Sequence, residues 1–204
     1  MRDDAERGGD AGGREPGPYT LANGLTALRI LLAPVFLVLY VSGDRLRALA
    51  AFTAAAATDV LDGLVARALH QHTRLGAALD PIADKFLAAC ALIALAATGR
   101  LPWWLPALVV SRDALQIGGA VLLRATGREV PIAPTRIGKY ATFGLAVVVV
   151  LALAGDYAAY PRAVVGPHVA AWALLAAQCV ALSFGQYFLL FVRTMRTHPG
   201  EPGA

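Results

Sequence analysis

Hydrophobic residues dominate six long stretches of the chain, and short segments rich in glycine, proline or charged residues separate them. An α-helix needs about 17 to 25 mostly apolar residues to cross a bilayer, and each stretch has about that length. The predicted spans are residues 25–41, 46–68, 75–98, a fourth that ends near 123, 136 to about 154, and about 168–192. The pattern predicts an all-α fold, an integral membrane bundle of six transmembrane helices, with residues 155–167 as a loop.

A short N-terminal segment at residues 20–29 is predicted to lie at the membrane interface and to lead into the first span. Asn23, Thr26 and Arg29 follow at three-residue spacing, so on a helix they face one direction. Arg29 then either reaches the interface with its long side chain or faces a polar cavity. The alternative to a functional face is a helix start with an interfacial arginine.

The composition supports a membrane protein with polar tails. Of the 204 residues, 57% are hydrophobic and 16% are charged, whereas a soluble domain is about half apolar and about a quarter charged. Residues 1–18 and 197–204 are rich in glycine, with proline and charged residues, and we expect both segments to be disordered. The membrane domain is therefore placed at residues 19–196.

Basic residues are distributed unequally between the two sides of the predicted bundle. The net charge is +4, but no basic cluster resembles a nucleic-acid-binding surface, so no nucleic-acid partner is expected. The side that holds both termini carries Arg67, Arg74, Arg124, Arg128, Arg136 and Lys139, and the opposite side carries Arg45, Arg47, Arg100 and Arg162. Cytoplasmic connections carry an excess of Lys and Arg. We therefore expect a multi-pass protein of a bacterial inner or plasma membrane, with both termini in the cytoplasm.

Four aspartates interrupt the second and third apolar stretches. Asp59 and Asp62 are three residues apart, and Asp80 and Asp84 are four apart, so each pair shares one helix face. A charged side chain at the bilayer centre costs roughly 2.5–3.5 kcal/mol, so four of them in lipid would cost on the order of 10 kcal/mol. The acids must therefore lie near an interface or be neutralised. Clustered carboxylates favour a divalent cation such as Mg²⁺, which prefers oxygen ligands.

Residues between the acids favour ligand binding over a purely structural role. The structural alternative is that the acids pair with Arg67, Arg74, Lys85 or Arg112 and tie helices together. Gly63 and Gly76 would let a bulky group approach the backbone beside the acids. Arg67 would bind a phosphate oxygen or hold a carboxylate in place. Metal, phosphate and close backbone approach together indicate substitution at a diphosphate.

The complete motif resembles that of a known enzyme family. It reads Asp59-x2-Asp62-Gly63-x2-Ala66-Arg67-x8-Gly76-x3-Asp80-x3-Asp84. In every fixed position and spacing it resembles the signature of the CDP-alcohol phosphatidyltransferases. The resemblance in length and predicted spans covers nearly the whole chain beyond residue 18. It implies transfer of a phosphatidyl group from CDP-diacylglycerol to an alcohol, with release of CMP, in phospholipid biosynthesis.

The resemblance also implies a role for each residue of the motif. Two divalent ions, Mg²⁺ or Mn²⁺, would be held by Asp59, Asp62, Asp80 and Asp84. The CDP-linked lipid would be bound by Asp62, Gly63, Ala66, Arg67, Thr73 and Gly76. Asp84 would also be the general base that takes the proton from the acceptor hydroxyl. A homodimer is expected because members of the family pair.

Other segments resemble two branches of the family. Asn23-Gly-Leu-Thr26-Ala-Leu-Arg29 is similar to the Pro-Asn-x-Leu-Thr-x-x-Arg opening of phosphatidylglycerophosphate synthases and cardiolipin synthases, with Ala22 in place of the proline. Ile137-Gly138-Lys139 resembles a segment of the phosphatidylglycerophosphate synthases. Ser111-Arg112-Asp113 is nearer to the cardiolipin synthases.

Three cations are predicted to surround an anionic acceptor: Arg112, Arg136 and Lys139. The alternatives are that Arg112 ties helices together through an aspartate, and that the other two only set orientation. sn-Glycerol 3-phosphate is the leading acceptor, phosphatidylglycerol the second, and inositol phosphate or another alcohol the third, because a basic set suits a phosphate.

Two other classes of protein carry acids inside a membrane. Membrane prenyltransferases use aspartate-rich helices and Mg²⁺, but they are longer and their two acidic motifs are separated. A cation transporter or channel would use the acids as an ion path. It would not require Gly63, Arg67 and Gly76, and the two halves of this chain show no repeat.

Overall fold

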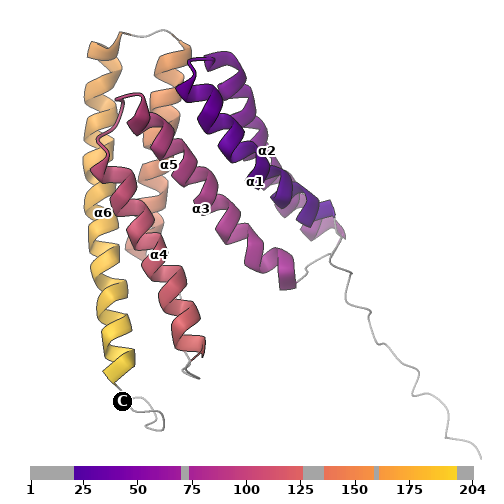
Figure 1. Cartoon of the computed structure of the whole chain (residues 1–204), viewed down its shortest axis with the longest axis vertical. Coiled ribbons are helices and arrows are strands. Elements are labelled where there is room, and N and C mark those ends of the chain that lie inside the picture. The colour runs from indigo at the N-terminus through magenta and orange to yellow at the C-terminus, as the bar shows by residue number, and fades with distance from the viewer. Residues whose placement is uncertain (1–20, 70–73, 126–135, 159–160, 197–204) are drawn as a thin grey trace, which may run out of the picture.

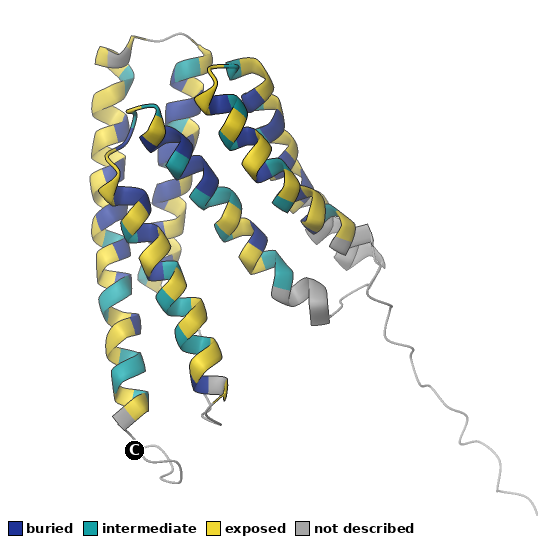
Figure 2. Cartoon of the chain, in the orientation of Figure 1, coloured by how far each residue is buried: buried dark blue, intermediate teal, exposed yellow. Residues whose placement is uncertain are grey.

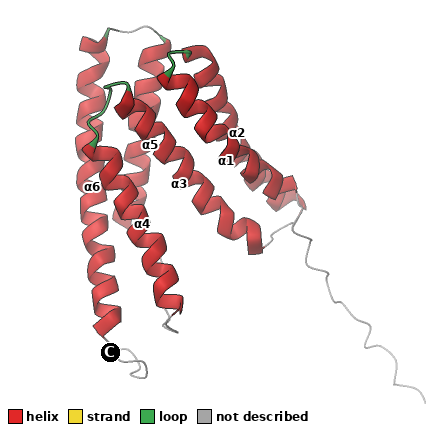
Figure 3. Ribbon diagram, in the orientation of Figure 1, coloured by secondary structure: helices red, strands yellow, loops and turns green. Residues whose placement is uncertain are grey.

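The computed structural model describes residues 21–69, 74–125, 136–158 and 161–196. Within these ranges all regular secondary structure is helical (Figures 1 and 3). The helices are α1 (Leu21–Val41), α2 (Arg45–Leu69), α3 (Arg74–Ala97), α4 (Trp104–Ala125), α5 (Arg136–Tyr157) and α6 (Arg162–Arg196). The predicted all-α class is confirmed, and each predicted span falls within one helix to within a few residues. The two predicted tails lie outside the described residues.

One prediction about boundaries was wrong. Residues 155–167 were expected to be a loop, but α5 continues to Tyr157 and α6 begins at Arg162. A Cβ on Gly155 would lie only 2.8 Å from Cγ1 of Val165, so the glycine lets the two helices pack closely here. This packing favours helical turns that glycine and proline alone would disfavour. From Leu21 the segment predicted to lead into the first span belongs to the same helix, α1, and its place at the membrane interface stays a prediction.

Consecutive helices run in alternating directions along the bundle (Figure 1). Gly43, with φ of 87°, lies in the α1–α2 turn, and Gly99, with φ of 69°, lies in the α3–α4 turn. Positive φ values favour glycine because it has no Cβ. These two turns, the end of α5 and the start of α6 lie at the upper end of the view in Figure 1. The start of α1, the end of α2 and the start of α3 therefore lie together at the opposite end.

The hydrophobic core includes residues from all six helices (Figure 2). Its fully buried side chains include Phe36 of α1, Leu92 and Leu95 of α3, Leu105 of α4 and Val148 of α5. α1 packs against α2 and α3, whereas α6 packs against α5 and α4. The core lies towards the end that holds the two glycine turns, so the acidic segments of α2 and α3 extend beyond its most tightly packed part.

Four of the described helices are long and apolar enough to cross a membrane. They are α1, α4, α5 and α6, and large apolar side chains such as Leu31, Val121 and Leu182 are at least 60% exposed on them. α2 and α3 do not meet the same criterion. Both carry aspartates and basic residues, and α2 is rich in alanine, which is only weakly apolar. The chain is thus a multi-pass membrane protein in which the two helices that do not meet this criterion carry the predicted motif.

A buried charge cluster joins four segments at the upper end of the bundle. The carboxylate of Asp156, only 5% exposed, forms ion pairs with Arg100 and with Arg45, whose Nη1 lies 3.6 Å away. Tyr40 donates its hydroxyl hydrogen to the same carboxylate. The guanidinium of Arg45 also lies 4.3 Å from the centroid of the Tyr40 ring. The cluster therefore connects the end of α1, the start of α2, the α3–α4 turn and the end of α5.

Candidate active site

Three of the four motif aspartates contact one face of α1. Arg29 is fully buried, and its Nη2 lies 3.1 Å from Oδ1 of Asp59 on α2. Its Nη1 lies 2.6 Å from Oδ1 of Asp84 on α3. One turn earlier, the hydroxyl of Thr26 donates a 2.7 Å hydrogen bond to Oδ1 of Asp80. Two polar residues of α1 thus hold carboxylates from two other helices.

Local helix geometry explains this convergence. Thr26 and Arg29 are three residues apart and share a face of α1, and both are almost completely buried. Asp80 and Asp84 are four residues apart, so they occupy successive turns of α3 and meet successive positions of α1. Arg29 therefore faces the acids and not the membrane interface, the other of the two alternatives that the sequence left open. The side chain of Asn23 lies outside the described residues.

The carboxylates remain accessible although their partner is buried. The side chains of Asp59 and Asp84 are 52% and 54% exposed, whereas Arg29 is 0% exposed. One guanidinium charge opposes the three described carboxylates, so the described part of the site carries a net negative charge. A negative, partly open site close to a predicted membrane interface favours binding of cations.

The donor set fits a hard divalent cation. Carboxylate oxygens are the ligands that Mg²⁺ prefers, and each of these aspartates keeps oxygen lone pairs beyond its contact with α1. Among the described side chains, however, no three His, Cys, Asp or Glu residues are grouped closely enough to hold one ion. Asp62 lies on α2, but its side chain is not described. The predicted ligand set of four aspartates therefore stays a prediction.

The residues predicted to bind the CDP group lie mainly outside the described side chains. Gly63, Ala66 and Arg67 belong to the last turns of α2, and Gly76 belongs to the first turn of α3. Their positions in the helices are described but their surroundings are not, and Thr73 falls in the undescribed residues 70–73. The predicted pocket is therefore untested.

A second polar network connects α3, α4 and α6. Arg112 is buried, and its Nη1 lies 2.6 Å from Oδ1 of Asp113. Its Nη2 donates a 3.3 Å hydrogen bond to Oγ of Ser183 on α6. The Nζ of Lys85 lies 3.3 Å from the same oxygen of Asp113 and donates a 2.7 Å hydrogen bond to Gln116. Arg112 thus pairs with an aspartate that lies outside the motif and on its own helix, so this pair does not itself tie two helices together as the alternative interpretation expected.

The predicted acceptor cations differ in their surroundings. Arg112 lies inside the network, with its guanidinium carbon 5.8 Å from the centroid of the Tyr187 ring. Arg136 and Lys139 lie in the first turn of α5 and are exposed. Exposure at a helix start suits both interpretations of these two residues, anion binding and an orientation signal. Their assignment to an acceptor site remains a prediction.

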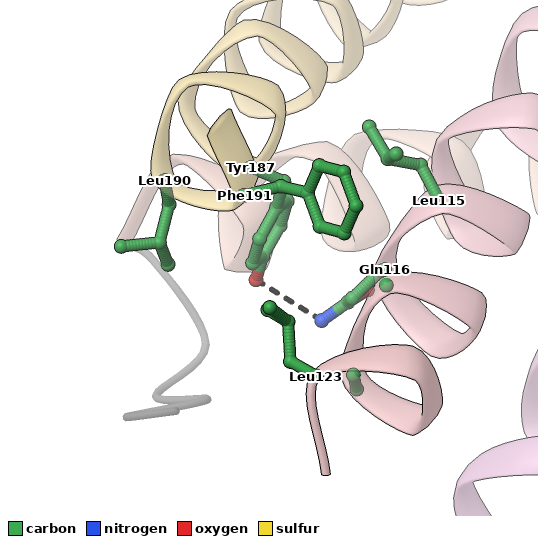
Figure 4. A pocket seen from close by; sticks show the side chains of 8 residues that line it. Leu115, Gln116, Leu123, Tyr187, Leu190 and Phe191 are labelled. Carbon is green, nitrogen blue, oxygen red and sulfur yellow. Dashed lines mark hydrogen bonds between the residues drawn. The ribbon is translucent and has the colours of Figure 1, made fainter. Parts of the chain in front are cut away.

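A small cavity lies between α4 and α6 (Figure 4). Apolar side chains such as Leu115, Leu123 and Phe191 line it, and a 3.0 Å hydrogen bond from Gln116 to the hydroxyl of Tyr187 crosses its polar side. Its volume of about 30 Å³ offers room for little more than a water molecule. This cavity is too small for a nucleotide or a lipid headgroup, so the aspartate face of α1 is the better candidate site.

Several polar residues with defined partners were not predicted from the sequence. They are Gln116, Ser183 and Tyr187 in the network and Asp156 in the upper cluster. Each lies in or near an apolar stretch, where a polar side chain must find a partner. This signal marks such residues as paired, but it does not identify which residues they pair with.

Comparisons with known proteins agree with the motif. The model of the CDP-alcohol phosphatidyltransferase family matches residues 19–184. A Mycobacterium tuberculosis protein that carries the name phosphatidylglycerophosphate synthase is 41% identical over 166 residues, covering 77% of this chain and 73% of the relative. A Mycobacterium bovis protein that carries the name cardiolipin synthase is 32% identical over 176 residues, covering 84% of this chain and 78% of the relative. The human CMP-forming cardiolipin synthase is 38% identical over 124 residues, covering 60% of this chain and 40% of the relative.

Proposed function

The chain belongs to the CDP-alcohol phosphatidyltransferase family and is an enzyme of phospholipid synthesis, and on this premise we propose that its acceptor is sn-glycerol 3-phosphate. The phosphatidyl group would come from CDP-diacylglycerol, and CMP would leave. Family membership sets aside the prenyltransferase and the cation transporter that the sequence alone left open. Phosphatidylglycerol is the second candidate acceptor, and inositol phosphate or another alcohol is the third.

The observation that carries the proposed transfer site, apart from the choice of acceptor, is the convergence of motif acids from α2 and α3 on α1. Asp59 and Asp84 are 25 positions apart in the sequence, yet both contact the guanidinium of Arg29. Asp80 is held one turn away by Thr26. A motif that only tied two helices together would leave its acids paired and buried, whereas Asp59 and Asp84 are about half exposed.

The proposed chemistry assigns the proton transfer to Asp84. Its carboxylate takes the proton of the acceptor hydroxyl as the hydroxyl oxygen attacks the phosphorus that bears diacylglycerol. The bond from this phosphorus to the oxygen shared with the CMP phosphate breaks, and CMP leaves with the electron pair. The contact with Arg29 through Oδ1 fixes the Asp84 carboxylate, while its exposed part can reach the acceptor.

We assign metal binding to Asp59, Asp62, Asp80 and Asp84, with two ions, Mg²⁺ or Mn²⁺. Bound divalent ions would stabilise negative charge on the attacking and the leaving oxygens of the displacement. Asp62, Gly63, Ala66, Arg67, Thr73 and Gly76 are proposed to bind the CDP-linked lipid. In this arrangement the end of α2 and the start of α3 lie beside the diphosphate.

The relatives support an anionic acceptor and the order of the candidates. The Mycobacterium tuberculosis protein named as a phosphatidylglycerophosphate synthase is 41% identical, and the proteins named as cardiolipin synthases are 32% and 38% identical. Basic residues at Arg112, Arg136 and Lys139 suit either acceptor, since both carry a phosphate. We therefore keep the same three acceptor residues for both candidates.

Release of CMP by the purified protein tests the function. The protein, in detergent with CDP-diacylglycerol and Mg²⁺, is offered sn-glycerol 3-phosphate, phosphatidylglycerol and inositol phosphate in parallel. The proposal expects the highest kcat/KM with sn-glycerol 3-phosphate. A higher value with phosphatidylglycerol would make the protein a cardiolipin synthase, and absence of CMP release with every alcohol would contradict the transferase assignment.

Replacement of Arg112 with Ala tests the acceptor site. We expect the KM for the acceptor to rise about tenfold, and more than the KM for CDP-diacylglycerol, because a charged hydrogen-bond donor is worth roughly 1.5–3 kcal/mol. Steady-state kinetics with each substrate varied in turn measures both values. A larger effect on CDP-diacylglycerol would move Arg112 out of the acceptor site. Unchanged KM values with a lower melting temperature would assign it to the link between α4 and α6.

Topology and assembly are also proposals. We place both termini and the aspartate-bearing ends of α2 and α3 in the cytoplasm, where CDP-linked lipids and soluble acceptors are available. The starts of α1 and α3 lie at the same end as the final turns of α6, which supports one common side for these segments (Figure 1). The choice of the cytoplasm rests on the excess of Lys and Arg on that side. A homodimer is proposed from the family resemblance alone.

A further inference from the structure

We infer that Arg29 and Thr26 are positioning residues that organise the metal-binding carboxylates from α1. This inference rests on the proposed metal site. It assigns a role to residues outside the aspartate motif, which spans Asp59 to Asp84. The two side chains are 0% and 1% exposed, and together they contact three of the four acids.

The geometry of Arg29 distinguishes this role from that of an ordinary ion pair. One guanidinium spans carboxylates from two helices, with Nη2 on Asp59 and Nη1 on Asp84, each through Oδ1. The planar fork of arginine has its donors in fixed directions, so it sets the distance between the two carboxylates. A lysine ammonium carries the same charge but is a compact point donor on a flexible stem, and it would set this distance less well.

The contacts leave room for a ligand on the carboxylates. A carboxylate has two oxygens and about four lone-pair directions, so one contact to α1 does not use up its capacity. Outer partners of this kind orient metal ligands, and their loss typically lowers metal affinity about 10- to 100-fold. The half-exposed Asp59 and Asp84 and the buried Arg29 match this division between ligand and support.

A competing interpretation predicts that loss of Arg29 strengthens metal binding instead of weakening it. If the guanidinium occupied the place of a cation, its removal would free two carboxylates and strengthen metal binding. If Arg29 only tied helices together, its removal would lower stability without a change in metal affinity. Direct measurement of metal binding therefore separates the three roles.

The test measures Mn²⁺ binding by electron paramagnetic resonance, in detergent and without lipid substrate, together with the rise in melting temperature that Mg²⁺ causes. We expect Arg29→Met to weaken Mn²⁺ binding about 10- to 100-fold. Arg29→Lys should fall between this variant and the wild type. Thr26→Val, which removes one hydrogen bond to Asp80, should weaken binding about two- to tenfold.

Matched controls come from the other end and another helix of the bundle. Arg45→Met also removes a charge that pairs with an aspartate, but it acts on the upper cluster, so it should lower stability and leave Mn²⁺ affinity unchanged. Thr142→Val removes a hydroxyl that donates a hydrogen bond to the carbonyl of Gly138, one turn earlier on its own helix. If Arg29→Met does not fold, Arg29→Lys and Thr26→Val still report on the site.

The outcomes separate this inference from the proposed function. A wild-type protein that binds no Mn²⁺ would contradict the proposed metal site itself. A wild type that binds Mn²⁺, with unchanged or tighter binding in the Arg29 and Thr26 variants, would overturn only the positioning role. Weaker binding in these variants, with normal binding in both controls, would support the role.

Discussion

Replacement of Asp84 with Asn is expected to lower kcat for CMP release about 10²- to 10⁴-fold, the contribution that a general base typically makes. Asparagine has nearly the same size, and its amide oxygen can still accept the hydrogen bond from Arg29, so the helices should keep their positions. It cannot take a proton from the acceptor at neutral pH. Binding of CDP-diacylglycerol should persist in part.

Asp84 is also a proposed metal ligand, so the loss of the base must be separated from the loss of metal. Asp80→Asn removes a proposed ligand on the same helix, one turn earlier, but leaves the base in place. At saturating Mg²⁺ we expect Asp80→Asn to regain more of its kcat than Asp84→Asn. Steady-state rates over a series of Mg²⁺ concentrations provide the comparison.

The control is Asp44→Asn, which removes a carboxylate in the α1–α2 turn, far from the site. Asp44 pairs with Arg47, whose side chain is 78% exposed, so we expect an unchanged kcat. Normal turnover in Asp84→Asn would show that another group accepts the proton. If saturating Mg²⁺ restored kcat equally in Asp80→Asn and Asp84→Asn, Asp84 would be a metal ligand and not the general base.

The helices could be predicted from the sequence because apolar length and helix breakers are local properties. The spans fell in the right places, and the spacing of Thr26 and Arg29 already indicated a shared face. The helical turns within residues 155–167 were missed because Gly155 and Val165 pack α5 closely against α6, a tertiary contact that no local pattern records.

The partners of the polar side chains could not be predicted in the same way. The motif identified four acids, but the sequence alone did not show that Arg29 would contact Asp59 and Asp84 rather than the membrane interface. Arg112 was expected to bind the acceptor or to pair with an aspartate, and it contacts the neighbouring Asp113. Pairing depends on how helices rotate about their axes, and side chains distant in the sequence determine that rotation.

The largest loss of stability is expected from replacement of Asp156 with Asn. This change leaves Arg100 and Arg45 without the carboxylate that both contact in the upper cluster. Removal of one partner of a buried ion pair costs about 3–5 kcal/mol. We expect a smaller loss, about 2–3 kcal/mol, because Arg45 is 35% exposed and water partly compensates for its lost partner.

Thermal unfolding in detergent measures this effect. For a chain of this size, a loss of about 2–3 kcal/mol corresponds to a melting temperature about 4–12 °C lower. Asp44→Asn is again the matched control, since it lies at the same end but its ion pair is exposed and worth at most about 1 kcal/mol. Equal shifts in the two variants would mean that the cluster contributes no more than a surface pair. Asp156 lies at the opposite end from the α1 face that holds the motif acids, so the protein that remains folded should keep its kcat. A lower kcat in the folded Asp156→Asn variant would instead indicate that the upper cluster also shapes the site.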